Sequence, residues 1–319
     1  MIWALLQPIQ EHGAAAAEQA GAAEPFNAGE VILEHVSNSS LDHPLIHFPT
    51  VFGIDLSFLS VTKHVFMLWV VAAAVFVGVT WIVRKYLKQP VPTGAANGLE
   101  FVVEFIRDSI AQPNVGKKWV NTWTPLLLTF FVFILASNLI GLIPVFDFLA
   151  LLNHYLFHAA PDTFFGKVLH GGTTATANYN VTAGLAVITF FAIILAGTKA
   201  HGFIKHFKNI VPHGLAWPIY ILLIPIEIMG MFVKPFALTM RLAANMTGGH
   251  IAILAVTSLV FLLTEMFKSS IAGMAVGFFV SVPLTVFISG LELIVVLVQA
   301  YVFTLLSAVF IGMAIHVHH

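Results

Sequence analysis

The sequence of 319 residues contains no cysteine and few charged residues. The absence of cysteine excludes disulfides, thiolate catalysis, iron–sulfur clusters and cysteine-ligated zinc. Charged residues make up 9% of the chain, whereas a soluble domain carries about 25%. This scarcity excludes a soluble enzyme and a disordered protein. The net charge of −1 leaves no basic field that would attract a nucleic acid.

Hydrophobic residues make up 59% of the chain, and they gather in long runs. A helix needs about 20 apolar residues to cross a membrane core of about 30 Å. We therefore predict an all-α polytopic membrane protein with about five membrane segments. The last two are each about 50 residues long, so they should be strongly tilted or broken. The expected spans are 65–83, 119–146, 181–198, 214–264 and 269–316.

The segments between and before these runs differ in charge. Residues 1–63 hold seven acidic residues and one basic residue, and we expect an external tail there, followed by a membrane domain over 64–319. Nine lysines and arginines fall on one side of the predicted spans and three on the other. Because basic loops stay in the cytoplasm, we expect the N-terminus outside and the C-terminus inside.

Residues 99–110 carry the pattern of an amphipathic helix. Leu99, Val102 and Ile106 share one face, while Glu100 and Glu104 lie on the other. The segment is too short to span, and we expect it to lie flat on the cytoplasmic membrane surface.

Six formal charges remain in the apolar last third of the chain, and an ionisable group inside a span costs about 2.5–3.5 kcal/mol. Glu227, Lys234 and Arg241 follow one another at intervals of seven residues, which places them on one helical face. Asn245 extends this stripe. An arginine stays protonated, so Arg241 needs a partner carboxylate that its own segment does not offer and another subunit could supply.

Three prolines, Pro218, Pro225 and Pro235, fall in the same segment and are expected to interrupt its backbone.

The fifth segment holds Glu292 and, seven residues later, Gln299, while the fourth holds His250. Glu265 and Lys268 read as the tip of a hairpin between the two segments. Position 250 lies nearer to this tip than position 292, so the two reach one depth only if the helices are offset or tilted. A histidine beside a membrane carboxyl group is suited to passing protons.

Three stretches resemble a known family. They are Lys234-Pro-Phe-Ala-Leu-Thr-Met-Arg241-Leu-Ala-Ala-Asn245-Met-Thr-Gly-Gly-His250, the C-terminal Glu292-Leu-Ile-Val-Val-Leu-Val-Gln299-Ala-Tyr-Val-Phe, and Asn138-Leu-Ile-Gly-Leu-Ile-Pro144. Together they resemble subunit a of the membrane sector of F-type ATP synthases, over about residues 60–319.

The resemblance implies a stator subunit, itself not an enzyme, in a bacterial inner membrane, with the c-subunit ring and the b subunits as partners. Two half-channels would carry protons to and from the ring carboxylates, and the last two helices would form a hairpin against the ring. By resemblance, Arg241 is the essential stator arginine, and Glu227 belongs to the inner half-channel. The outer half-channel and the ring contact would use Asn245, His250, Glu292 and Gln299.

The resemblance also bears on positions 250 and 292. Some members of the family carry Glu at the first and His at the second, so the exchange seen here preserves one acid and one imidazole. No cofactor or metal is implied.

Two other classes of protein, a haem protein and a secondary transporter, fit the sequence less well. A haem protein would need paired histidines deep in the spans, and most of the 15 histidines lie in tails and loops. A zinc site at His154 and His158 has no third ligand that we can name. A proton-coupled secondary transporter would show repeat symmetry and a substrate cavity, and the sequence shows no repeat.

Overall fold

The computed structural model describes residues 29, 62–86, 93–142, 175–209, 217–267 and 270–316. Every regular element among these residues is a helix. The chain divides into two compact units, which are described separately. The first unit comprises Met1–Leu68, Asn138–Ala175 and Asn245–Val295, and the second comprises Trp69–Ser137, Thr176–Ala244 and Val296–His319.

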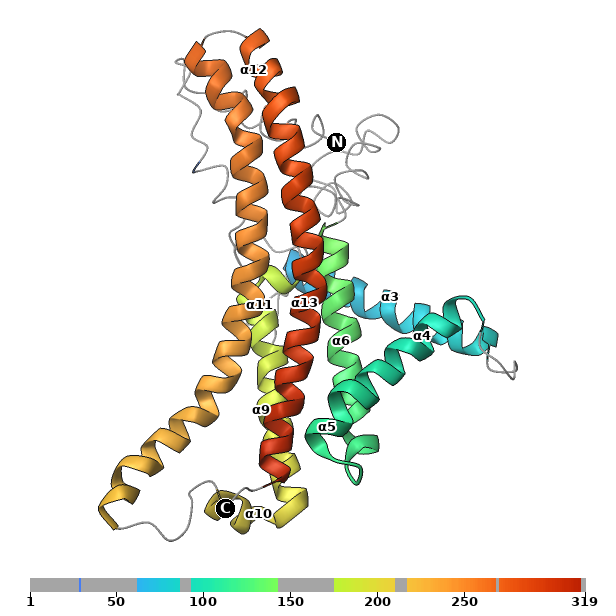
Figure 1. Ribbon diagram of the computed structural model, residues 1–319, viewed down its shortest axis with the longest axis vertical. Coiled ribbons are helices and arrows are strands. Elements are labelled where there is room, and N and C mark those ends of the chain that lie inside the picture. Colours follow the sequence, from blue (N-terminus) through green and yellow to red (C-terminus); the bar gives the residue numbers. More distant parts are fainter. Residues whose placement is uncertain are drawn as a thin grey trace, which may run out of the picture. The chain divides into compact units, whose positions relative to one another are not determined.

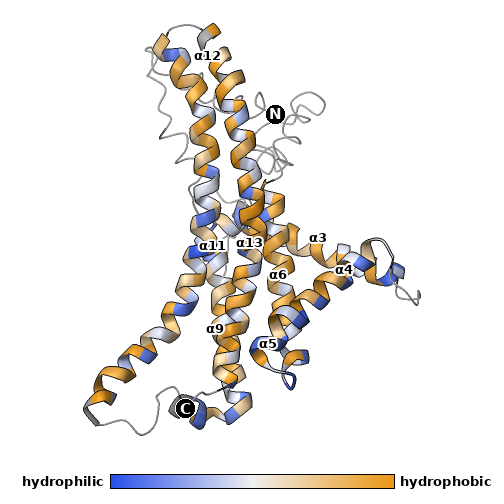
Figure 2. Ribbon diagram, viewed as in Figure 1, coloured by the Kyte–Doolittle hydropathy of each residue, from blue (hydrophilic) through white to orange (hydrophobic). Residues whose placement is uncertain are grey.

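Among the residues that the structure describes, five stretches of helix are long and apolar enough to cross a membrane (Figure 1). The predicted fold class, an all-α polytopic membrane protein, is confirmed. Figure 2 shows hydrophobic residues along most of their length. The long helices are α3 (Lys63–Tyr86), α6 (Val120–Leu142), α9 (Tyr179–His201), α11 (Trp217–Phe267) and α13 (Val282–Ile315). The fifth stretch also includes α12 (Ser270–Val276) and the π-helical turn η5 (Gly277–Ser281).

Helix α11 differs from the sequence-based expectation. It runs unbroken for 51 residues, although Pro225 and Pro235 lie inside it. The prediction that prolines interrupt this segment is therefore wrong at these two positions. Within a lipid bilayer no water is available to hydrogen-bond the backbone groups that an interrupted helix would expose. This favours a helix that continues across a proline. At 1.5 Å per residue the helix is about 75 Å long, far more than an upright span of about 30 Å needs.

In the first unit, the C-terminal half of α11 packs against α12 and the start of α13 as a hairpin (Figure 1). Gly273 lies directly against the Thr264 side chain, and a Cβ atom at Gly277 would meet Val260 at 3.4 Å. Small residues let two membrane helices approach this closely. The widened turn η5 ends just before Pro283, a residue that lacks the N–H that a regular helix would use.

The second unit has a hydrophobic core made by α6, α9 and the C-terminal part of α13. The rings of Phe130 and Phe303 meet edge to face, with their centroids 5.5 Å apart. Thr189 and Ser307 form a buried hydroxyl pair at 3.3 Å. At the end of α13, Gly312 lies against the backbone of Asn114 so closely that no Cβ atom would fit.

The amphipathic segment is present, but only its first part is a regular α-helix. It consists of α4 (Ala95–Glu104), the π-helix η2 (Phe105–Ala111) and the short α5 (Gln112–Val115). The predicted faces agree with the structure, since Ile106 is fully buried while Glu100 and Glu104 are exposed. The sequence did not predict that Ile106 belongs to the core of the second unit, which holds this end of the segment by packing.

Two histidines organise the end of α9 in the second unit. The Nε2 atom of His201 donates a hydrogen bond to the Ile315 carbonyl at 2.9 Å. His206, on α10 (Phe203–Asn209), lies with its ring directly against Gly197, where any Cβ atom would overlap it. Burial lowers the pKa of His206, and the nearby His201 lowers it further. Both effects on this pKa favour the neutral form of the His206 imidazole.

Several predictions fall on other parts of the chain. Three parts of the chain lie outside the described residues: nearly all of the acidic tail over 1–63, most of the 147–180 loop with His154 and His158, and Lys268 at the hairpin tip. The orientation of the chain in the membrane and the domain boundaries stay predictions.

Candidate functional site

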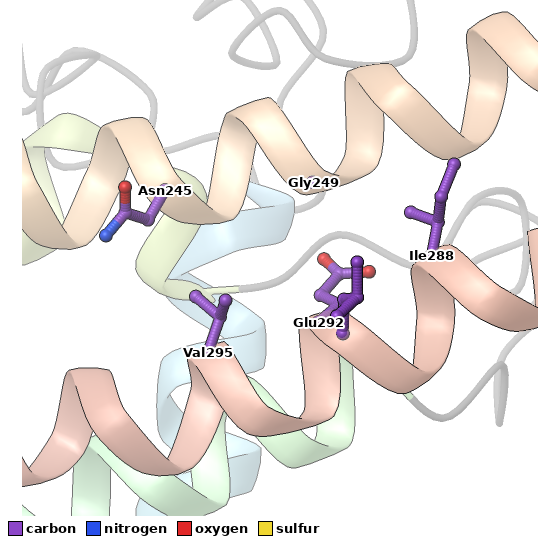
Figure 3. Close-up of a pocket in the computed structure, with 6 residues that line it drawn as sticks. Asn245, Gly249, Ile288, Glu292 and Val295 are labelled. Atoms are coloured by element: carbon purple, nitrogen blue, oxygen red, sulfur yellow. The ribbon is translucent and has the colours of Figure 1, made fainter.

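The first unit contains a cavity of about 250 Å³ between α11 and α13 (Figure 3). Its lining is mostly apolar, with one amide and one carboxyl group. In Figure 3 the Glu292 side chain extends from α13 towards α11 near Gly249. The lining residues are Asn245, Gly249, Ile288, Leu291, Glu292 and Val295.

Glu292 is the buried acid of this cavity. The residue is only 5% exposed, and neither carboxyl oxygen has a hydrogen-bond partner among the residues that the structure describes. Buried polar groups are rarely left in this state, and an unsatisfied one calls for a functional reason or a water molecule. A membrane carboxyl group that no protein donor occupies is free to exchange a proton with water or with a group brought to it.

Gly249 creates the space that Glu292 fills. A Cβ atom at position 249 would lie 2.5 Å from Oε1 and 2.9 Å from Cδ of Glu292. The carboxyl group therefore rests on the backbone of α11, one residue before His250. The offset between the two segments that the sequence required is present, because position 292 is level with position 249.

Three further predicted residues lie on α11 near this cavity or just before it in the sequence. Arg241 and Asn245 are exposed, and His250 is partly buried. Among the residues that the structure describes, none pairs with the Arg241 guanidinium. That a group outside the chain supplies its partner stays a prediction.

Glu227, Lys234 and Gln299 lie in the second unit. Glu227 and Lys234 are partly buried, and the Lys234 ammonium lies 5.6 Å from the centre of the Phe310 ring. This cation–π contact gives Lys234 a packing role. Gln299 on α13 is 4% exposed.

Sequence reasoning did not identify Gly249 as a site residue. Its signal was the Gly248-Gly249 pair inside a long membrane helix, since small residues mark places where another helix or a side chain comes close. The buried hydroxyls of Ser281 and Thr285 were also missed. Within the described residues, no three His, Asp or Glu side chains form a group able to hold a metal ion.

Replacing Gly249 by alanine should displace the Glu292 carboxyl group. Overpacking of this kind costs typically about 1–3 kcal/mol. We expect proton transport by membrane vesicles that contain this chain to fall about tenfold, while the amount of the chain in the membrane stays unchanged. Shortening the acid with Glu292→Asp in the same protein should restore part of the activity.

The control for this prediction is Gly184→Ala, because Gly184 lies in α9 with open space where the Cβ atom would go. This variant should keep normal activity. Unchanged activity in Gly249→Ala would show that proton transport does not depend on the position of the Glu292 carboxyl group against Gly249.

The fold and the site together define a multi-pass membrane protein with ionisable residues inside its last two helical segments. The family model described as ATP synthase A chain matches residues 65–312. The chain therefore belongs to the ATP synthase subunit a family, and it is a member of the ATP synthase complex.

Relatives from several bacteria are similar along most of the chain. ATP synthase subunit a 2 of Chlorobium luteolum is 43% identical over 310 residues, which is 93% of this chain and 79% of the relative. The protein of the same name from Prosthecochloris aestuarii is 40% identical and covers 95% and 84%. ATP synthase subunit a of Anaeromyxobacter dehalogenans is 38% identical and covers 97% and 75%.

Proposed function

We propose that this chain is the proton-conducting stator subunit of an F-type ATP synthase. It forms two half-channels that carry protons to and from the carboxylates of a c-subunit ring, and it thereby couples proton flow to rotation. The chain itself catalyses no reaction, since the ATP chemistry lies on other subunits. It spans a bacterial inner membrane with its N-terminus outside and its C-terminus in the cytoplasm, and it contacts the c-ring and the b subunits.

The observation that carries this proposal is the environment of Glu292. A buried carboxyl group without a described partner sits beside α11, the helix that carries Arg241, Asn245 and His250. The carboxyl group therefore rests against the residue that immediately precedes His250 in α11, so an acid and an imidazole fall on the same part of the hairpin. The exposed Arg241 on the same helix offers a fixed positive charge to a ring carboxylate that passes it.

The roles of the individual residues in this proposal are those that the resemblance to the family implies. Asn245, His250, Glu292 and Gln299 serve the outer half-channel and the ring contact, and Glu227 serves the inner half-channel. Arg241 attracts the deprotonated ring carboxylate and blocks a direct proton leak between the half-channels. The rival function, a proton-coupled transporter, finds less support, because the Glu292 cavity is small and largely apolar for a solute site.

The proposal is tested by purifying the chain from membranes through an affinity tag. An oligomeric c-ring and the b subunits should accompany it in stoichiometric amounts. Recovery of the chain without a ring, or with a bound solute, would contradict the proposal.

A further inference from the structure

Two buried hydroxyl groups near the hairpin tip are not used by the function described above. Ser281 at the end of η5 and Thr285 in α13 are 2% and 7% exposed. Neither side-chain oxygen has a hydrogen-bond partner among the described residues. Most buried polar groups are paired, so two such groups four residues apart require an explanation.

Other hydroxyls of the same helices behave differently. Thr264 on α11 and Thr304 on α13 donate to the carbonyl four residues earlier, at 2.7 and 2.8 Å. Thr257 donates to the Ile253 carbonyl in the same way, at 2.8 Å. This back-bonding is the usual way for a hydroxyl inside a helix to be satisfied. Ser281 and Thr285 do not use it, and their oxygens are left for another partner.

Ser281, Thr285 and Glu292 lie on one face of the helix. Their spacings of four and seven residues place all three within a stripe about 40° wide. We call these three residues the polar stripe. At 1.5 Å per residue, Thr285 lies about 10 Å from Glu292 along the axis, and Ser281 about 6 Å further. Hydrogen-bonded oxygens lie about 2.8 Å apart, so about one water molecule would bridge the shorter interval and about three the longer one.

The polar stripe runs along the contact between the two arms of the hairpin. Val260 faces Gly277 at one end of this stretch, and Gly249 faces Glu292 at the other. Ser281 and Thr285 fall between these two contacts. The stretch thus begins at Gly277, about 10 Å along the axis from the start of α12, and ends at the cavity of Glu292.

We propose that Ser281 and Thr285 hold a file of water that links the hairpin tip to Glu292, and that protons reach Glu292 along it. The proposal rests on the proposed function, to which it adds the access route and two residues. Each hydroxyl both donates and accepts, so it can pass a proton along a chain of waters without keeping a charge. The partner missing from all three side chains is then the same one, water.

The absence of cysteine from the chain makes the route measurable. Ser281→Cys and Thr285→Cys each introduce the only thiol of this subunit, in the assembled complex in membrane vesicles. A thiol reacts as its thiolate, which forms in water but not in an apolar setting. The probe is a positively charged, membrane-impermeant methanethiosulfonate, and the matched control is Val286→Cys, on the exposed face next to Thr285.

We expect both test cysteines to react at least about tenfold faster than the control, because one unit in thiol pKa changes the thiolate fraction tenfold. The reagent should act only when it is added on the outer side. Labelling should also inhibit proton-driven ATP synthesis. Unreactive cysteines, or reaction only from the inner side, would overturn the route.

A second variant distinguishes a water-binding role of the Thr285 hydroxyl from a role of this side chain in packing alone. Thr285→Val keeps the shape of the side chain and removes its hydroxyl. It should slow proton-driven ATP synthesis, while the amount of this subunit in the complex stays unchanged. Normal synthesis rates in Thr285→Val would show that the hydroxyl takes no part.

The same vesicles distinguish failure of the route from failure of the proposed function. If Arg241→Lys abolishes proton-driven synthesis but the cysteines are unreactive, the function stands and the route is wrong. If the cysteines react and Arg241→Lys is fully active, the water file stands and the proposed function is wrong.

Discussion

Replacement of Arg241 by lysine is expected to reduce proton-driven ATP synthesis to below about 1% of its normal rate, a loss equivalent to about 2.7 kcal/mol. Lysine keeps a charge, but it is a compact ammonium that loses its proton readily in an apolar setting. Arginine keeps its charge and presents a planar array of five donors. The guanidinium is exposed on α11, where an outside carboxylate can approach it. Synthesis is measured in membrane vesicles energised by a proton gradient.

The alanine variant at the same position has a different expected result. In the proposed function the Arg241 charge separates the two half-channels, so Arg241→Ala should also allow passive proton leak. Membrane conductance of the alanine and lysine variants is compared in vesicles with equal amounts of complex. Normal synthesis in Arg241→Lys would refute the assignment, and unchanged conductance in Arg241→Ala would refute the leak-blocking role.

The exchange of His250 and Glu292 should show that the two residues act as a pair. His250→Glu alone places two acids at adjoining positions and should reduce ATP synthesis about tenfold or more. Adding Glu292→His restores one acid and one imidazole, and it should recover part of the loss. Residues that share one function typically show a coupling energy of about 0.5–3 kcal/mol in such a cycle.

The four proteins of this cycle are compared at equal expression in the complex. Defects of the two single variants that simply add in the double variant would argue against a coupled pair. The contact of Glu292 with Gly249 is the structural basis for the expected coupling, because it brings the carboxyl group next to the residue that precedes His250.

The membrane spans could be predicted because lipid imposes a simple requirement. A segment that crosses the bilayer must be apolar and helical, and the sequence shows both properties directly. The same requirement explains why α11 continues through Pro225 and Pro235. Proline rules derived from water-exposed helices pointed to interruptions at both positions.

The details of helix packing were less accessible to prediction. The register of the hairpin decides which residue meets Glu292, and it is set by close contacts such as Gly273 with Thr264. Between that contact and the one of Glu292 with Gly249, α11 uses fewer residues than the facing arm. The π-helical turn η5 lies in this longer stretch and accounts for one of its extra residues. In the sequence only Pro283 indicated such a turn.

The site was predicted in part. Arg241, Asn245, His250 and Glu292 stand out as polar residues in apolar runs, and a resemblance in sequence marks the same positions. Gly249, Ser281 and Thr285 do not stand out, because glycine, serine and threonine are ordinary residues in membrane helices. Their importance comes from what they contact, or from the partner that they lack among the described residues.

The central claim is that this chain conducts protons only together with a c-ring. Passive proton flux through the membrane sector tests it directly. The sector is purified without its ATP-hydrolysing part and reconstituted in liposomes, and a potassium diffusion potential drives uptake that a pH-sensitive dye records. We predict uptake by the chain with its ring and none by the chain alone. Equal uptake with and without the ring would contradict the account.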